Sequence, residues 1–512
     1  MSKYLYAASV QGIQSFIFQT NVLRDIVGAS ELVDCICTEA FKKLLGIGWK
    51  EEDQVIAAAG NVKYIFDSKE ECAKAVEQFP YKVMTMAPGI TISQAVVELG
   101  DDFEAAVNSV EEKLRAQRNK IQPPVTAGLL GMRRAPGTGL PAVGTKGSSG
   151  SGDFIDASTI SKQKMNDTVS LCVKSFYGKD RYKPGDAEYR VLYDLVPFDV
   201  SDICGKNDWI AVIHADGNSL GQVVRHVGHE RKAFSDFSRE LDDATILSAN
   251  DAFKNLKDID KTVGNGESII PIRPIVLGGD DMTVIIRGDL AIPYVAKYIE
   301  SFEGHTGDGD IADILGKAGM KRLTACAGVA FIKSSFPFYY GYRLAESLCD
   351  AAKNVAKKRA KELKQQEVPS CLMFHKVQDS FIESYSDIVE RELTPAKGIS
   401  LQYGPYYLKN APDGFSTIKD LNDSCTLLGK DGTEGDDIRP AIRRWLGLLH
   451  EDPEKAKQWL NRVKAVHPGS KKLIGTLTDF TERGDKQTCP AYDVLALNTI
   501  NNQVTNEARD DD

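Results

Sequence analysis

The sequence has no run of about 18 apolar residues, and its start, MSKYLYAASVQG, lacks the charged and then apolar pattern of a secretory leader. Cysteine is sparse, with ten among 512 residues, and no Cys-x-x-Cys pair occurs. These absences argue against membrane insertion, a disulfide framework and a cysteine-type zinc site. They predict a cytoplasmic protein without a membrane partner.

Positive charge is not in excess either. Lys and Arg total 63 against 72 Asp and Glu, which gives a net charge of −9. A general basic surface is therefore excluded, and any contact with nucleic acid requires a local patch. The content of 42% hydrophobic and 26% charged residues is ordinary for a soluble protein with buried cores, and the length favours about two to four domains.

The first 120 residues alternate strand and helix patterns. Predicted strands lie at 4–10, 55–59, 62–66 and 90–99, and predicted helices at 29–45, 71–79 and 103–117. Gly60-Asn61 is typical of a hairpin turn between two strands, and Asp101 and Asp102 are candidate caps of the last helix. The order β-α-β-β-α-β predicts a ferredoxin-like domain.

The same order recurs about 200 residues later. Predicted strands lie at 209–215, 272–277, 282–287 and 323–332, predicted helices at 231–256, 292–302 and about 344–355, and residues 372–375 are expected to close the sheet. The predicted fold class is therefore α+β, with two ferredoxin-like domains.

The composition changes abruptly between the two units. Residues 131–152, GMRRAPGTGLPAVGTKGSSGSG, are rich in glycine and have no apolar period, which predicts a linker or a mobile loop. The expected divisions are a first domain at 1–120, a linker with a small connecting subdomain at 121–205, a second domain at 206–415 and a helical C-terminal domain at 416–512. Residues 438–466 carry the clearest helical pattern of that last part.

Three carboxylates stand where the element order brings strand ends together. Asp216 ends the first strand of the second unit, and Asp280 and Asp281 lie on the turn of its hairpin. In a β-α-β-β-α-β sheet these strands are neighbours, so the carboxylates repel unless a cation lies between them. Magnesium suits such a set, and Gly278 and Gly279 allow a triphosphate to approach the backbone. Taken alone, VLGGDDMTV is also compatible with a plain hairpin turn.

At this point the sequence resembles a known family. The segments VLGGDDMTVII, IAVIHADGNSLG and LTACAGVAFI…RLAESLCDAAKNVAKK are similar to the catalytic palm of the large polymerase/cyclase subunit of type III CRISPR effector complexes, and more distantly to GGDEF-type nucleotide cyclases. VQGIQSFIF and LRDIVGASELVD resemble the opening of that family's first, catalytically silent palm. The resemblance covers most of residues 1–376.

The resemblance implies roles for individual residues. Asp216, Asp280 and Asp281 would bind two Mg²⁺ or Mn²⁺ ions, and Asp280 and Asp281 would help to deprotonate an attacking 3′-hydroxyl. Lys353 would hold a triphosphate, although a solvated helix lysine is the alternative. Gly278 and Gly279 would line the nucleotide pocket. Asn218 stands where many family members have another acidic residue.

The first palm is expected to lack catalytic activity but to contribute to a nucleotide site. Its hairpin, AAAGNVKYIF, has no acidic residue near the turn, so metal catalysis there is implausible. Two palms facing each other would form a composite nucleotide site. Gly28 and Ser30, in the expected turn GAS, are candidates for nucleotide contacts, and a helix N-cap is the alternative for Ser30.

Two features of that family are missing. None of the seven histidines is followed by Asp, so the family's nuclease pair is absent, and the stretch between the two units has no paired cysteines for zinc. The favoured function is a nucleotidyltransferase or cyclase that joins NTPs, with ATP as the expected substrate, into an oligonucleotide second messenger for antiviral defence. The alternative is a non-nuclease scaffold subunit of a guide-RNA effector complex. The expected partners are effector subunits and guide RNA, or a second copy of the chain.

Overall fold

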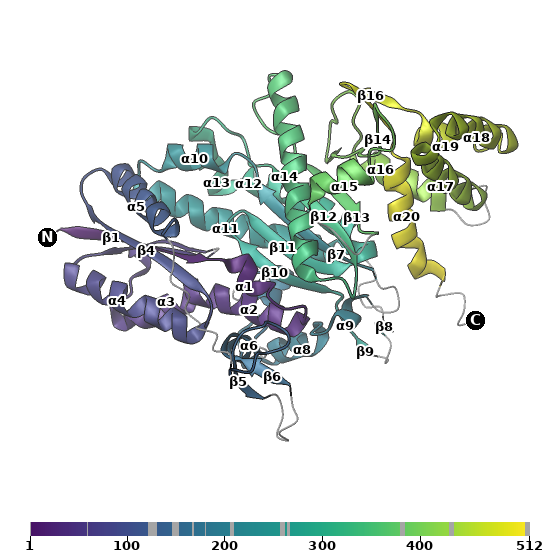
Figure 1. The fold of residues 1–512 in the computed structure, drawn as a ribbon. Coiled ribbons are helices and arrows are strands. Elements are labelled where there is room, and N and C mark those ends of the chain that lie inside the picture. Colours follow the sequence, from purple (N-terminus) through teal and green to yellow (C-terminus); the bar gives the residue numbers. More distant parts are fainter. Residues whose placement is uncertain are drawn as a thin grey trace.

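The computed structural model describes residues 2–58, 60–120, 131–145, 153–165, 168–179, 181–204, 209–256, 262–263, 267–378, 384–429 and 435–506. Three parts lie side by side (Figure 1). The N-terminal unit lies at one end, a larger α+β unit occupies the centre, and the C-terminal helices lie at the other end.

The N-terminal unit is a four-stranded antiparallel sheet with the strand order β2-β3-β1-β4. This order is that of a ferredoxin-like sheet, so the first predicted domain fold is confirmed. Its elements are β1 (Lys3–Gln11), α1 (Ile13–Ile17), α2 (Leu23–Cys35), a π-helix (Ile36–Ala40), α3 (Phe41–Leu45), β2 (Gln54–Ala58), β3 (Asn61–Phe66), α4 (Lys69–Met86), β4 (Thr91–Leu99) and α5 (Phe103–Arg118).

Local signals explain where some of these helices begin. The side chain of Asp102 accepts a hydrogen bond of 2.9 Å from the amide of Ala105, so Asp102 is the cap of α5 that the sequence predicts. The predicted turn GAS is wrong, because Gly28 and Ser30 lie inside α2, which begins at Leu23. Both residues are buried, and this helix contacts β10, where the Ser30 hydroxyl donates a hydrogen bond to the carbonyl of Ile275.

The second unit contains a six-stranded sheet with the order β10-β11-β7-β12-β13-β15. Its first four strands in the chain repeat the order of the N-terminal sheet, which confirms the predicted repeat. The elements are β7 (Trp209–Gly217), α10 (Leu220–Val227), α11 (Arg231–Lys254), β8 (Thr262–Val263), β9 (Glu267–Ser268), β10 (Ile272–Gly278), β11 (Asp281–Arg287), α12 (Ala291–Thr306), α13 (Gly309–Lys317), β12 (Ala325–Lys333), α14 (Phe338–Glu362), β13 (Cys371–Lys376) and β15 (Tyr406–Tyr407).

The far edge of this sheet differs from the expectation. The strand β13 runs parallel to β12, and α14 makes the crossover between them. The prediction that residues 372–375 close the sheet is wrong, because β15 pairs antiparallel with β13 and forms the edge. A tyrosine pair, Tyr406 and Tyr407, supplies this last strand and is buried.

The connecting segment is more ordered than its composition suggests. Within the predicted linker, β5 (Ala142–Thr145) pairs with β6 (Phe154–Asp156), so the linker prediction is wrong for residues 142–145, and residues 146–152 lie outside the described residues. The helices that follow are α6 (Ala157–Gln163), α7 (Ser170–Tyr177), α8 (Ala187–Leu195) and α9 (Val200–Cys204).

These connecting helices join the two units into one core. The helix α6 packs on α2 of the first unit, and α7 packs on α11 and β10 of the second. The ring of Phe176 stacks on that of Phe253 with centroids 4.1 Å apart, and the Lys162 ammonium donates a hydrogen bond of 2.7 Å to the carbonyl of Phe16. The relative position of the two sheets therefore depends on buried contacts.

The C-terminal part combines helices with a small sheet of order β14-β17-β16. Its elements are α15 (Tyr385–Arg391), β14 (Ile399–Ser400), α16 (Ile418–Gly429), α17 (Gly435–Glu451), α18 (Pro453–Val466), α19 (Lys471–Thr478), β16 (Thr481–Arg483), β17 (Lys486–Thr488) and α20 (Ala491–Asn506). The helical pattern over 438–466 is split at Asp452, whose side chain accepts hydrogen bonds from the amides of Glu454 and Lys455 and so begins α18.

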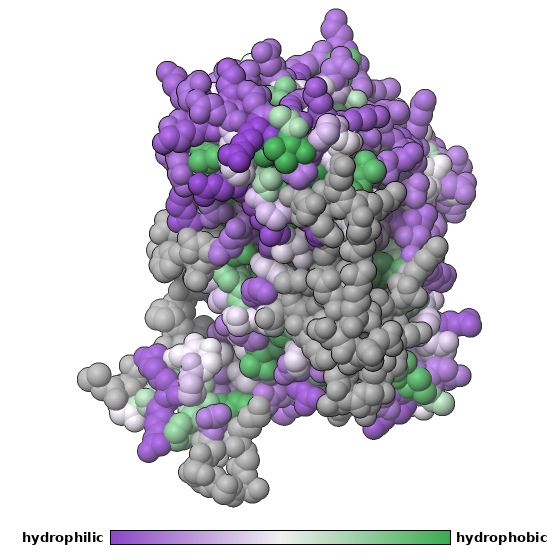
Figure 2. All heavy atoms as spheres, turned by 90° about the vertical axis from the view of Figure 1, so that its right-hand side faces the viewer, coloured by the Kyte–Doolittle hydropathy of each residue, from purple (hydrophilic) through white to green (hydrophobic). Residues whose placement is uncertain are grey.

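The outer surface of this part is mainly polar. Figure 2 shows a largely hydrophilic upper face with a few separate apolar patches. Among the helices of the described residues, none combines the length and the apolar character needed to cross a membrane.

Candidate active site

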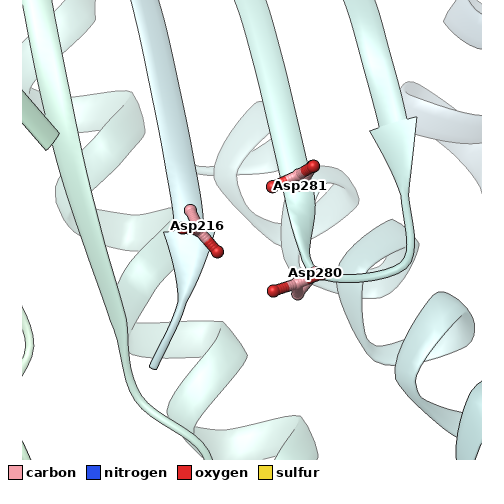
Figure 3. A group of neighbouring side chains, drawn as sticks. All are labelled: Asp216, Asp280 and Asp281. Atoms are coloured by element: carbon pink, nitrogen blue, oxygen red, sulfur yellow. The ribbon is translucent and has the colours of Figure 1, made fainter. Parts of the chain in front are cut away.

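The structure brings the three predicted carboxylates together at one end of the second sheet. Antiparallel pairing of β11 with β7 places Asp281 opposite Asp216, and Asp280 precedes Asp281 on the hairpin turn. Ligand oxygens of Asp216, Asp280 and Asp281 all lie within 4.8 Å of one another. Figure 3 shows one side chain on the end of β7 and two on the neighbouring hairpin.

The hairpin turn is held in place by helix α11. Gly278 pairs with Asp281, so Gly279 and Asp280 form the turn, and Gly279 has a positive φ of 62° that favours glycine. The hydroxyl of Thr245 donates a hydrogen bond of 2.6 Å to the carbonyl of Gly279. The amide of Gly279 donates one of 3.2 Å to the carboxylate of Asp242. These contacts fix the position of Asp280.

Gly217 allows the close approach of the carboxylates. A Cβ atom at this position would lie 3.0 Å from the Cβ of Asp280 and 3.0 Å from a methyl group of Leu220. Sequence reasoning did not single out Gly217, Thr245 or Asp242. The position of Gly217 directly after Asp216 could have revealed it from the sequence. Thr245 and Asp242, on α11, belong to no sequence motif that could have revealed them.

Burial and mutual repulsion perturb the acidity of the pair on the hairpin. Both Asp280 and Asp281 are half-buried on this turn. Burial, the charge of Asp281 and a hydrogen bond to Asp216 raise the pKa of Asp280 above its ordinary value. Burial and the charge of Asp216 raise the pKa of Asp281, although Lys353 counteracts part of this shift. Such a cluster is stabilised either by protons or by cations.

Lys353 lies beside the cluster rather than in solvent. Its ammonium forms an ion pair with Asp216 and donates a hydrogen bond of 2.9 Å to the carbonyl of Gly217. The side chain is 12% exposed, so the alternative of a solvated helix lysine is wrong. Burial opposes the charged form, but the hydrogen bond and the charge of Asp216 prevail and raise the pKa of Lys353.

A glycine on β12 determines how closely the Lys353 helix approaches the sheet. A Cβ atom on Gly328 would lie 1.9 Å from the carbonyl oxygen of Ala345 and 2.5 Å from the amide nitrogen of Cys349. Only glycine therefore lets α14 lie directly on β12 at this point. Sequence reasoning missed Gly328, because nothing in the local pattern reveals which helix crosses the strand.

Asn218 points away from the carboxylates. The residue is 1% exposed, and its side-chain amide donates hydrogen bonds of 3.0 Å to the Thr324 hydroxyl and 3.4 Å to the Cys326 sulfur. Asn218 therefore ties the end of β7 to β12 and is not part of the described acidic cluster.

A small cavity of about 140 Å³ separates the two units next to the cluster. It is bounded by residues of both units, namely Ile13, Gln14, Ile17, Ser30, Val33, Asp34, Gly60, Leu171, His214, Ile275, Val276, Leu277, Gly278, Asp281, Thr283 and Tyr342. Ser30 donates a hydrogen bond to the carbonyl of Ile275, so it faces the second unit as well as the cavity. Gly28 is buried within α2 and is not among the cavity residues.

Helix α1 of the first unit borders the cavity and contacts α14. The side-chain amide of Gln14 donates a hydrogen bond of 2.7 Å to the Tyr342 hydroxyl. The rings of Phe18 and Tyr342 stack with centroids 4.8 Å apart. The two ferredoxin-like units thus meet around a cavity that Asp281 borders, and a composite nucleotide site at this place stays a prediction.

Comparison with known proteins agrees with this architecture. Residues 209–361 match the family model described as Cas10/Cmr2, second palm domain. No curated protein matches the sequence.

Several solved structures share the fold over nearly the whole chain. A Csm1-Csm4 cassette in complex with cA4 is 13% identical, with a TM-score of 0.55 over 99% of this chain and 70% of that one. A Csm1-Csm4 cassette in complex with pppApApA is 14% identical, with a TM-score of 0.57 over 98% and 69%. Csm1 in T. onnurineus is 14% identical, with a TM-score of 0.53 over 98% and 69%. Residues 209–361 therefore match the second palm domain of Cas10/Cmr2, within a chain whose fold is similar to that of Csm1.

Proposed function

We propose that this protein is a metal-dependent nucleotidyltransferase that joins ATP into linear or cyclic oligoadenylates, as the large subunit of a type III CRISPR effector complex. The observation that carries the proposal is the cluster of Asp216, Asp280 and Asp281, with oxygens within 4.8 Å of one another on a domain that matches the second palm of Cas10/Cmr2. The product would act as a second messenger in antiviral defence.

The donor set fits hard divalent cations. Three carboxylates supply only oxygen ligands, which Mg²⁺ and Mn²⁺ prefer, and burial together with the neighbouring carboxylates raises the pKa of Asp280 and of Asp281. We assign the cluster to two such ions, held by Asp216, Asp280 and Asp281. When bound, these ions supply positive charge that stabilises the attacking and leaving oxygens of a phosphoryl transfer.

The side chains of the chain itself would perform the remaining steps. A 3′-hydroxyl attacks the α-phosphate of the donor, the new O–P bond forms, and the bond to pyrophosphate breaks. Asp280 and Asp281, beside the reacting groups, would accept the hydroxyl proton. Lys353 would exchange its contact with Asp216 for the donor triphosphate, because both partners offer anionic oxygens.

The glycines of the hairpin would allow the backbone to approach the donor. Gly278 borders the cavity directly, and Gly279 lies on the turn that carries Asp280. Neither residue has a side chain that would keep a triphosphate away from the main chain.

The acceptor nucleotide would bind between the two units. The hairpin of the first unit carries no acidic residue, and we assign this unit the role of a catalytically silent palm. Ser30 would contribute to the acceptor site directly, and Gly28 would contribute indirectly, as part of helix α2. A cavity of about 140 Å³ is smaller than the ~300 Å³ at which small-ligand sites begin, so binding requires the Gln14–Tyr342 contact to open. Opening and closing of this contact would couple the two palms to turnover.

The substrate assignment draws on the similar proteins. Those structures are of Csm1-Csm4 cassettes in complex with cA4, with pppApApA and with AMPPNP. We extend adenine nucleotides to this chain as substrates, and a Csm4-like subunit and guide RNA as partners. A second copy of this chain remains the alternative partner.

Purified protein incubated with each NTP in turn, with Mg²⁺ or Mn²⁺, tests the proposal by mass spectrometry of the products. We expect oligoadenylates from ATP, and none from a variant that carries Asp280→Asn and Asp281→Asn. The exposed Asp423→Asn, on α16, is the matched control and should retain wild-type activity. If the protein makes no product alone or with its effector subunits and target RNA, yet assembles with them, the scaffold function is correct instead.

A further inference from the structure

A groove lies between the second sheet and the C-terminal helices, far from the carboxylates. It has a volume of about 440 Å³ and is lined by Lys376, Gln378, Leu401, Arg443, Leu446, Gly447, His450, Tyr492, Leu495, Ala496 and Thr499, a set that we call the α17–α20 groove. Helix α20 contacts both β13 and α17, and lies at this junction in Figure 1.

The groove and the carboxylates lie at opposite ends of the same sheet. Lys376, at the end of β13, places its ammonium 4.7 Å from the ring centre of Trp209, which begins β7. Asp216 stands seven positions further along that strand. At the rise of an extended chain this separation is ~23 Å, so the groove is distinct from the nucleotidyltransferase site.

Among the described residues that line the groove, the positive side chains have no acidic counterpart. Lys376, Arg443 and His450 belong to its wall, and none of its described lining residues is Asp or Glu. Burial, with the nearby charges of Arg443 and Lys333, lowers the pKa of Lys376 to about 8. Such an unbalanced cluster is unusual in a protein of net charge −9 and favours an anionic ligand.

Two described carboxylates, Glu392 and Asp493, already have partners and do not line the groove. Glu392 lies 3.6 Å from the buried His375. Asp493 is buried and accepts a hydrogen bond of 2.8 Å from the Tyr406 hydroxyl. Neither side chain is therefore placed to neutralise the lysine and the arginine of the wall.

The lining of the groove also includes apolar side chains and one aromatic ring. Its leucines are Leu401, Leu446 and Leu495. The ring of Tyr492 stacks on that of His375, with centroids 6.2 Å apart and planes inclined by 14°. Its hydroxyl accepts a hydrogen bond of 3.0 Å from the Gln378 side chain, so the half-buried ring is held in one orientation.

We propose that the α17–α20 groove binds single-stranded nucleic acid, with a phosphodiester between Lys376 and Arg443 and a base against Tyr492. The cations match phosphate oxygens, and Arg443 is already oriented by its hydrogen bond of 3.1 Å to the Thr499 hydroxyl. The apolar side chains and the fixed ring match a nucleobase and give inorganic phosphate nothing to contact. The volume falls within the ~300–1,000 Å³ of small-ligand sites, which suits a single nucleotide.

Binding of a fluorescein-labelled oligouridine of about ten nucleotides, followed by anisotropy at several salt concentrations, tests this proposal. The full chain is used without NTP or divalent ions, so the result does not depend on nucleotidyl transfer. We expect Arg443→Gln and Lys376→Gln each to weaken binding about tenfold and to reduce the salt dependence by about 0.7 in the log–log slope. Arg444→Gln, an exposed neighbour on α17 outside the groove, should bind like the wild type.

Two further measurements separate the base contact from simple charge attraction. Tyr492→Leu should weaken binding at least fivefold, whereas Tyr492→Phe, which keeps the ring, should not. Millimolar inorganic phosphate should compete poorly with the oligonucleotide. The proposal is overturned if the wild type does not bind, if Arg444→Gln weakens binding as much as Arg443→Gln, or if phosphate alone saturates the groove and displaces the oligonucleotide.

Discussion

Replacing Asp281 by Asn should stabilise the metal-free protein while it destroys the response to metal. Asp216, Asp280 and Asp281 have oxygens within 4.8 Å of one another, and Lys353 forms an ion pair with Asp216. Two unit charges at that separation repel by about 3 kcal/mol at an effective dielectric constant of about 20. Removing one carboxylate relieves part of this repulsion, and the isosteric amide fills the same space.

The direction of the pH dependence follows from the acidity of the cluster. The pKa values of Asp280 and Asp281 lie above the ordinary value of 3.8, so the folded protein holds protons that the unfolded chain has lost. The contribution of these groups to the free energy of unfolding is therefore largest near pH 4 and declines as pH rises through the folded-state pKa values. The stability advantage of Asp281→Asn should be small at pH 5 and largest at pH 8.

Thermal unfolding, in EDTA and in Mn²⁺ or Mg²⁺, measures both effects. In EDTA at pH 8 the variant should melt above the wild type, by at most about 2–4 °C for each kcal/mol gained. Added metal should raise the melting temperature of the wild type more at pH 8 than at pH 5, because the ions replace protons, and should raise that of Asp281→Asn little. The exposed Asp423→Asn should behave as the wild type in every condition. A variant that melts below the wild type in EDTA, or that keeps the full metal response, would refute the reasoning.

Three further substitutions test the triphosphate contact, the packing of α14 on β12 and the metal ligand Asp216. Lys353→Met should raise the KM for ATP at least tenfold, measured by product formation, because one cation for the triphosphate is lost; an unchanged KM would contradict that role. Gly328→Ala places a Cβ atom 1.9 Å from a carbonyl oxygen of α14 and should cost about 1–3 kcal/mol or more in a denaturant titration, whereas Gly316→Ala, with open space around it, should not destabilise. Asp216→Asn should weaken metal binding, so that activity recovers partly as Mg²⁺ is raised; full activity at low Mg²⁺ would exclude Asp216 as a ligand.

Much of the architecture follows from local patterns. Hydrophobic periodicity predicts the repeated β-α-β-β-α-β order, and that order by itself makes the first strand and the hairpin neighbours. The placement of Asp216 opposite Asp281 follows, because the register of two paired strands determines which residues lie opposite each other. The cap at Asp102 joins two residues only three positions apart, Asp102 and Ala105, so the local sequence was enough to predict it.

Other features depend on contacts between distant parts of the chain. Gly28 and Ser30 look like a turn because their residue types favour one, yet burial against β10 keeps them helical. The ion pair of Lys353 with Asp216 joins residues 137 positions apart, and the half-burial that perturbs Asp280 comes from elements packed around the hairpin.

The α17–α20 groove also depends on contacts between distant parts of the chain. Its lysine, arginine and tyrosine come from β13, α17 and α20, so no local window of the sequence contains them together. The sequence by itself determined that the first strand pairs with the hairpin in each unit and which carboxylates meet, because those relations are local or follow from strand order. Only the tertiary structure decided what surrounds those groups, since burial and electrostatic partners depend on which distant surfaces pack against each other.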